Sequence, residues 1–299
     1  MVPYATRIGI IGLIIWSASA LFNSIAAALP TFEILTFALG LGFLAGSVYL
    51  TFNKSWHKLK QNSIFTFLGF LGVFGNEFFF VSAFKMAPAA HITLINYLWP
   101  IIVVACLSSM PKQEFCLRTI LAAIIGFVSV AYIIIQDSIT QFNPQYYLGY
   151  LFVVLGTMMW SIYIIVNRRA CAIPSEMITL YCGIGAVISL IMHLFTESFI
   201  IPDVQQTIAL LWLGVMSMCV AFKCWNFGTL HGNIGLLSVL SYNNVLISTI
   251  LLMLFNNAGF NPHLIISVFG LMLASLLSCC ELRVIKEKYQ QILKSRFSP

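Results

Sequence analysis

Glu77 is the residue best placed for acid–base chemistry, because it lies deep within the apolar stretch 64–84. If that stretch crosses a bilayer, an ionised carboxylate there costs about 2.5–3.5 kcal/mol, so such residues usually face a cavity or a partner. We expect Glu77 to line a cavity and to contact a proton or the ammonium group of a ligand. The alternative is a neutral carboxyl group hydrogen-bonded to a neighbouring helix.

A second group of candidates crowds one turn of the stretch 91–110: Asn96, Tyr97, Trp99 and Pro100. Proline removes a backbone donor and frees a carbonyl on the previous turn, which a helix bundle tolerates beside a cavity or a polar neighbour. The aromatic rings offer apolar faces with a polar atom, which suits an aromatic or amphipathic ligand. A binding site and a kinked packing helix both fit this pattern.

The stretch 233–255 contains the polar pair Asn243 and Asn244 near its middle. Adjacent helical positions point about 100° apart, so at least one should face protein or a cavity. Lining of a cavity is favoured over interhelical hydrogen bonding, which contributes only about 0.6 kcal/mol in membranes. Ser241 and Tyr242 belong to the same surface.

Lys223 lies about one turn from the end of the stretch 206–227, where we expect its side chain to extend towards lipid headgroups. Counted at 1.5 Å per residue, it lies about 6 Å deep and Glu77 about 20 Å deep, so no ion pair is expected. His231 and Asn233 form a possible pH-dependent gate in the next link, although turn chemistry alone explains them. We expect the other histidines to be interfacial: His57, His91, His193 and His263.

These residues belong to a chain that repeats itself. Trp16-Ser17 recurs as Trp160-Ser161, 144 residues later. The same offset relates three more pairs: Gly12 and Gly156, Asn23 and Asn167, Pro30 and Pro174. Trp16 and Trp160 would either line a path or anchor in lipid. A duplicated half is common in secondary transporters.

Composition places the chain in a membrane: 60% of residues are apolar, 8% are charged, and the mean hydropathy is +0.96. Continuous apolar runs without strict alternation predict helices and not a barrel. At about 20 residues per crossing, ten spans are expected: 8–28, 32–52, 64–84, 91–110, 116–136, 146–166, 176–196, 206–227, 233–255 and 262–284.

The positive charges predict the orientation. With the N-terminus inside, Lys85 is the one basic residue of the chain that falls outside, so both termini should be cytoplasmic. Five spans per half then give two inverted repeats, residues 1–145 and 146–299, with a substrate site at their interface. The basic tail after residue 282 should meet anionic headgroups. The formal charge of +6 is scattered, which argues against nucleic-acid binding.

Two strings carry a resemblance: Asn96-Tyr97-Leu98-Trp99-Pro100, and Trp225-Asn226-Phe227-Gly228-Thr229-Leu230-His231-Gly232-Asn233. With these, the chain resembles the drug/metabolite transporter superfamily of ten helices in two inverted halves, and within it the bacterial aromatic amino acid exporters. The resemblance implies that Trp225 and Asn226 also line the cavity. Val245, where the exporters have proline, Lys223, where they have a small residue, and Asn243-Asn244 depart from that pattern.

We therefore predict a monomeric secondary or facilitative transporter of the bacterial inner membrane. It would export small amphipathic metabolites, aromatic or hydrophobic amino acids above all, by alternating access. The alternative is an exchanger or uptake carrier for a nucleoside-like or methyl-donor compound. No phosphate-binding loop, H-E-x-x-H or G-x-S-x-G motif occurs, so neither an ATP-driven pump nor an enzyme is expected. No cofactor or metal is predicted, because the eight cysteines form no C-x-x-C pair.

Overall fold

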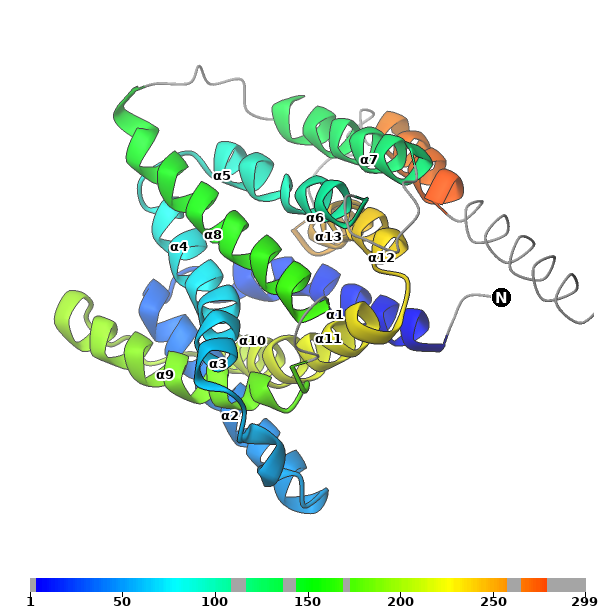
Figure 1. Cartoon of the computed structure of the whole chain (residues 1–299). Coiled ribbons are helices and arrows are strands. Elements are labelled where there is room, and N and C mark those ends of the chain that lie inside the picture. The colour runs from blue at the N-terminus through cyan, green and yellow to red at the C-terminus, as the bar shows by residue number, and fades with distance from the viewer. Residues whose placement is uncertain (1–3, 109–116, 137–143, 169–172, 257–264, 279–299) are drawn as a thin grey trace, which may run out of the picture.

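The computed structural model describes residues 4–108, 117–136, 144–168, 173–256 and 265–278, and within them the chain is helical without strands (Figure 1). The basic tail lies outside the described residues. The helices are α1 (Tyr4–Ala26), α2 (Thr31–Phe52), α3 (Ser63–Phe70), α4 (Asn76–Phe84), α5 (Ala89–Asn96), α6 (Trp99–Ser108), α7 (Leu117–Gln136), α8 (Tyr147–Val166), α9 (Met177–Thr196), α10 (Val204–Leu211), α11 (Phe222–His231), α12 (Ile234–Leu240), α13 (Asn243–Asn256) and a last helix, Ile265–Ser278.

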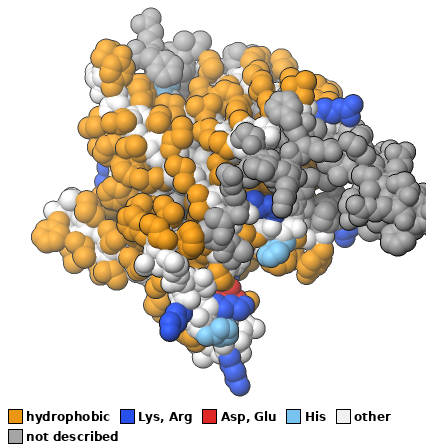
Figure 2. All heavy atoms as spheres, viewed as in Figure 1, with side chains coloured by type: hydrophobic (Ala, Val, Ile, Leu, Met, Phe, Trp, Pro, Cys, Tyr) orange, Lys and Arg blue, Asp and Glu red, His pale blue; other side chains and the backbone are white. Residues whose placement is uncertain are grey.

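Seven helical segments in the described part of the chain are long and apolar enough to cross a membrane. Three shorter apolar helices accompany them: Leu117–Tyr132, Ile234–Ser248 and Ile265–Ser278. All of these segments overlap expected spans. Hydrophobic side chains cover most of the described surface visible in Figure 2, and basic and histidine side chains gather at its lower tip. This surface suits lipid and not water, so the prediction of an all-helical membrane protein is confirmed in its class.

Two of the long segments contain a widened turn. A π-helical stretch, η2 (Leu71–Gly75), joins α3 to α4, and a longer one, η5 (Trp212–Ala221), joins α10 to α11. Stretches of π-helix are rare and often occur at functional sites. Glu77 and Lys223 each follow directly after one of these stretches.

Two other helices are broken. α5 ends at Asn96 and α6 starts at Trp99, so the chain leaves the helix directly before Pro100. The break follows from Pro100, which has no N–H to bond the Asn96 carbonyl four residues earlier and whose ring clashes with that carbonyl. α12 ends at Leu240 and α13 starts at Asn243, with no proline near the break.

Glycines allow the main helices to pack closely. α1 runs along α11, α2 along α9, and α4 along α8 (Figure 1). A Cβ atom on Gly12 would lie 2.8 Å from the Ala221 carbonyl oxygen, and one on Gly156 would lie 3.2 Å from the Asn76 carbonyl oxygen. The duplicated glycines therefore bring α1 and α8 each against the end of a π-helical stretch, as small residues do in membrane helix pairs.

Candidate functional site

Four tryptophans from four segments meet at the centre of the bundle: Trp16 on α1, Trp99 on α6, Trp160 on α8 and Trp225 on α11. We call them the tryptophan cluster. Trp16 and Trp225 have ring centroids 5.7 Å apart, and Trp99 lies 5.6 Å from Trp225. Trp160 is within 6.5 Å of each of the other three. Sequence analysis selected all four residues, and the structure brings them together.

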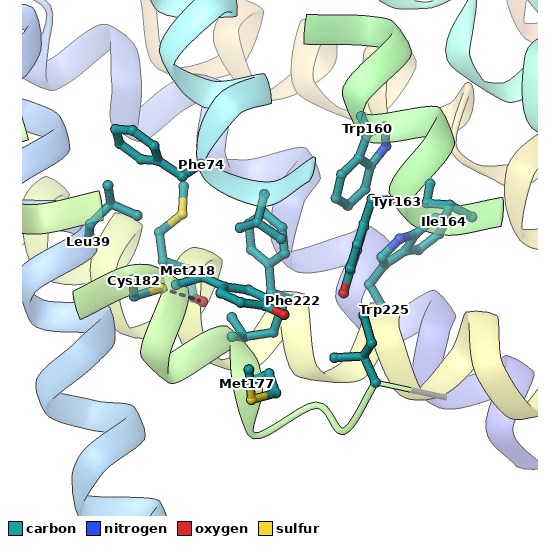
Figure 3. Close-up of a cluster of buried hydrophobic side chains, with 14 of the residues drawn as sticks. Leu39, Phe74, Trp160, Tyr163, Ile164, Met177, Cys182, Met218, Phe222 and Trp225 are labelled. Carbon is teal, nitrogen blue, oxygen red and sulfur yellow. Dashed lines mark hydrogen bonds between the residues drawn. The ribbon is translucent and has the colours of Figure 1, made fainter. Parts of the chain in front are cut away.

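Local structure explains how these rings converge. Trp99 begins α6 directly after the break at Asn96, and Trp225 follows η5 by one turn. Phe222 packs edge-on against Trp16 and Trp160, with ring centroids 4.9 and 5.8 Å away. Figure 3 shows Trp160, Phe222 and Trp225 within one cluster of buried hydrophobic side chains. Edge-to-face packing of this kind adds about 0.5–1.5 kcal/mol per pair to the burial of area. Trp16 is partly exposed and the other three indoles are buried, so in this conformation the cluster is accessible from outside only at Trp16.

Asn226 organises a hydrogen-bond network beside the cluster. Its Oδ1 accepts from Asn167 Nδ2 and from the Tyr163 hydroxyl at 2.9 Å. Its Nδ2 donates to the Ile173 carbonyl and to Ser175 Oγ, each at 3.1 Å. With 1% of its surface exposed, Asn226 on α11 connects α8 and the loop before α9, and its amide is occupied by protein in this conformation.

Glu77 and Lys223 have few polar contacts. Glu77 is partly buried, and the described residues give its carboxylate no hydrogen bond or ion pair. Lys223 Nζ is enclosed by protein and lies 4.1 Å from the centre of the Tyr49 ring. The expectation that Lys223 reaches the headgroups is therefore wrong, whereas the expected lack of a Glu77–Lys223 ion pair holds in the described structure.

The remaining residues around the two helix breaks make contacts with other helices. Tyr97 and Tyr242 face each other with centroids 6.3 Å apart. Asn96 Oδ1 accepts a long hydrogen bond of 3.4 Å from Thr157 on α8. Ser241 is buried and donates to the Ser238 carbonyl of its own helix. The two breaks therefore lie beside one another.

Asn243 and Asn244 both bond to neighbouring helices. Asn243 Nδ2 donates to Ser275 Oγ at 3.3 Å, and Asn244 Oδ1 accepts from Ser17 Oγ at 3.1 Å. The interhelical alternative thus describes this pair better than the favoured lining of a cavity.

The link between α11 and α12 shows turn chemistry. Asn233 caps α12 by accepting from the Leu236 N–H at 2.8 Å, and its own N–H donates to Thr6 Oγ1 at 2.9 Å. His231 is exposed and stacks near Phe227, with ring centroids 4.7 Å apart. Nothing in these contacts tests the predicted gate.

A charged cluster that sequence analysis missed joins α2, α4 and α9; we call it the Glu197 cluster. Glu197 accepts from Lys85 Nζ at 2.9 Å and from the Phe32 N–H at 2.9 Å. His193 Nδ1 is 3.1 Å from Glu197, and its Nε2 is 3.8 Å from Glu33 Oε2. The His193 ring is buried within this cluster, in the last turn of α9. The spacing of His193 and Glu197 by four residues, which puts them on one helix face, was the available signal.

The pKa of Glu197 reflects these contacts. Burial alone would raise it, but hydrogen bonds from His193, Lys85 and the Phe32 N–H hold the pKa below its usual value. The N-terminus of α2 also favours a negative charge at that place. Glu197 is therefore an anionic link between three helices.

The described residues contain no group of three or more His, Cys, Asp or Glu side chains that could hold a metal ion. Cys182 and Cys219 are buried thiols, which suits the apolar role expected for the cysteines.

Comparisons with known proteins fit this arrangement. The model of the EamA-like transporter family matches residues 6–135 and again residues 147–280. The aromatic amino acid exporter YddG of Ancylobacter novellus is 32% identical over 261 residues, which cover 86% of this chain and 89% of that protein. The protein of the same name from Salmonella typhimurium is 24% identical over 171 residues, 54% of this chain and 57% of that one.

A crystal structure of a further protein is also similar. Its TM-score is 0.86 at 28% identity, with 92% of this chain and 96% of that chain covered. The lipid-facing surface, the helical architecture and these matches agree with the resemblance noted in the sequence. The chain belongs to the EamA-like transporter family.

Proposed function

We propose that the protein is a secondary transporter that exports aromatic and other hydrophobic amino acids by alternating access. The tryptophan cluster carries this proposal, because four indoles from four membrane segments meet beside the break before α6 and the end of η5. Flat apolar rings with polar edges suit a substrate that is itself aromatic. The names of the two relatives support the same substrate class.

The proposed mechanism needs two halves that move against each other. We infer ten membrane helices in two inverted repeats, residues 1–145 and 146–299. Packing supports this arrangement: α1 lies along α11 and α4 lies along α8, as an exchange of equivalent helices between two halves would produce. The family match also occurs twice, once on each side of residue 146.

The remaining parts of the proposal concern placement and energy. The protein would lie in the bacterial inner membrane. The distribution of Lys and Arg supports an orientation with both termini in the cytoplasm. With no phosphate-binding loop in the sequence, the driving force is a gradient of the substrate or of protons. Glu77, an acid within a membrane segment, is our candidate for proton coupling.

Flux of labelled phenylalanine and tryptophan into proteoliposomes, with and without an imposed pH difference, tests this function. Trp16→Ala should lower the flux at least tenfold, because it removes the exposed edge of the cluster. Trp56→Ala is the matched control, since Trp56 lies outside the cluster and is 46% exposed. If wild-type protein moves neither amino acid while a nucleoside-like compound passes, the proposed substrate class is refuted.

A further inference from the structure

We propose that an open groove beside α3 binds an anionic phospholipid, with the lipid phosphate on Lys60 and an acyl chain along Phe67 and Phe70. The groove has a volume of about 420 Å³ and is formed by the link before α3, by α3 itself and by α9. This inference concerns the membrane around the protein, so it does not depend on which molecule is transported.

The lining of the groove changes from polar to apolar along its length. Lys60 and Gln61 belong to the link, and Ser63 is the first residue of α3. Phe70 and Ile184 each lie seven residues beyond the start of their helices, about 10 Å further along the helix axis. A phospholipid carries its groups in the same order, with a phosphate and ester oxygens followed by hydrocarbon chains. The groove therefore matches a lipid from headgroup to chain.

The link before α3 supplies positive charge. Residues 53–62 include three lysines and one histidine and no acidic residue. Lys58 is paired with Glu176 at 2.6 Å, whereas the described part of the chain gives Lys60 no ion pair. The end of α2 and this link form the lower tip of the view in Figures 1 and 2, where basic and histidine side chains gather. Lys60 is therefore available to an anion at the polar end of the groove.

Trp56 indicates the level of the headgroups. It is exposed, and its Nε1 donates to Thr51 Oγ1 at 3.1 Å. Exposed tryptophans are enriched where a membrane protein crosses from lipid to water. Lys60 follows Trp56 by four residues, and the exposed side chains of Ile64 and Phe67 come next, at the start of α3. A lipid phosphate at the normal headgroup level would thus meet Lys60. In the orientation proposed above, this is the cytoplasmic leaflet, whose surface is negative.

The apolar wall favours a lipid over other anions. Phe67 and Ile184 are exposed on the hydrophobic surface of the bundle, so they contact acyl chains in a membrane. Inorganic phosphate would bind Lys60 alone and leave this wall uncovered. A zwitterionic lipid would cover the wall, but its own positive group reduces its attraction to Lys60. An anionic diacyl lipid matches both ends of the groove.

Native mass spectrometry of the detergent-purified protein tests this site with palmitoyl-oleoyl phosphatidylglycerol and palmitoyl-oleoyl phosphatidylcholine, which have identical chains. Wild-type protein should bind the first phosphatidylglycerol about fivefold more tightly than phosphatidylcholine, the effect of one basic residue near an anionic headgroup. This comparison requires no variant to fold. Equal affinity for the two lipids overturns the inference.

Lys60→Gln should remove this preference and leave the affinity for phosphatidylcholine unchanged. Lys54→Gln is the matched control, because Lys54 lies in the same link and is exposed but does not line the groove. It should change the phosphatidylglycerol affinity by less than about twofold, since water and salt screen its charge. Phe67→Ser should weaken both lipids, because it removes part of the apolar wall.

Three results would contradict the site. Equal losses in Lys60→Gln and Lys54→Gln would show that the whole basic link attracts lipid and that the groove has no special part. Displacement of phosphatidylglycerol by inorganic phosphate would assign Lys60 to a soluble anion. A lipid-free dimer that phosphatidylglycerol does not dissociate and that is lost in Phe67→Ser would assign the groove to a second copy of the chain.

Discussion

Gly228→Ala should destabilise the contact between α1 and α11. An added Cβ would lie 2.6 Å from Gly9 Cα, 2.9 Å from Gly9 N and 3.2 Å from the Ala5 carbonyl oxygen. All three atoms are backbone, so no side chain can rotate away. Carbon atoms pack at about 3.5–4.0 Å, so the two helices would have to separate by about 1 Å.

The magnitude follows from two opposing effects. Overpacking of a well-packed site costs about 1–3 kcal/mol. Replacing a helical glycine by alanine gains at most about 1 kcal/mol of helix propensity. Gly40→Ala isolates the second effect, because a Cβ on Gly40 meets no atom within 4 Å. The difference between the two variants therefore measures the clash alone.

Thermal unfolding of purified protein in one detergent provides the assay. Gly228→Ala should unfold several degrees below Gly40→Ala, and Gly40→Ala should equal or exceed wild type. A Gly228→Ala variant as stable as the Gly40→Ala control would show that α1 and α11 do not touch at this point. The close packing described for these helices would then be wrong.

Three further predictions concern polar contacts. Glu197→Gln should lower the melting temperature at neutral pH. The pKa of Glu197 is depressed in the folded protein, so its ionised form stabilises the fold above the ordinary pKa of a carboxyl group. This stabilisation is lost as the pH falls through the lower pKa of the folded state. The melting temperatures of wild type and variant should therefore become equal in acid. Lys58→Met should cost less than about 1 kcal/mol by denaturant unfolding, although its Nζ lies 2.6 Å from Glu176, because this lysine is exposed. The hydrogen bond to Glu176 raises the pKa of Lys58, so this pKa should fall in an NMR titration of the Glu176→Gln variant. An unchanged pKa would contradict the ion pair in the structure. Asn226→Leu should lower the free energy of unfolding by at least about 2 kcal/mol, because it leaves buried hydrogen-bonding groups on α8 and the next loop without a partner. An unchanged melting temperature would refute that network.

The sequence predicted the membrane helices well, because apolar runs of sufficient length leave few other structures. It also offered a kinked helix at Pro100 as one of two alternatives, since proline acts locally. The matching break at Ser241–Tyr242 has no proline. Its one signal is that Ser241-Tyr242 follows Asn96-Tyr97 by 145 residues, close to the repeat offset of 144. That spacing indicates an equivalent position and not a conformation.

The polar partners of the site were less predictable. Lys223 was placed near the headgroups by counting back from residue 227, whereas α11 continues to His231 and leaves Lys223 about two turns from the helix end. The Glu197 cluster joins residues more than 160 positions apart, such as Phe32 and Glu197. Which side chains meet across such distances depends on how α2 packs against α9, and no local pattern in one sequence specifies that packing.

The widened turns before Glu77 and Lys223 also affect how these segments could move. A π-helical turn holds an extra residue relative to its α-helical form, so relaxing it by one residue would swivel the following helix by about 100° about its own axis. Such a swivel needs no hinge and little sideways displacement through lipid. Glu77 and Lys223 lie in the first turn after the π-helical stretches, so this rotation would change the direction in which each side chain points. Their depth in the membrane would hardly change.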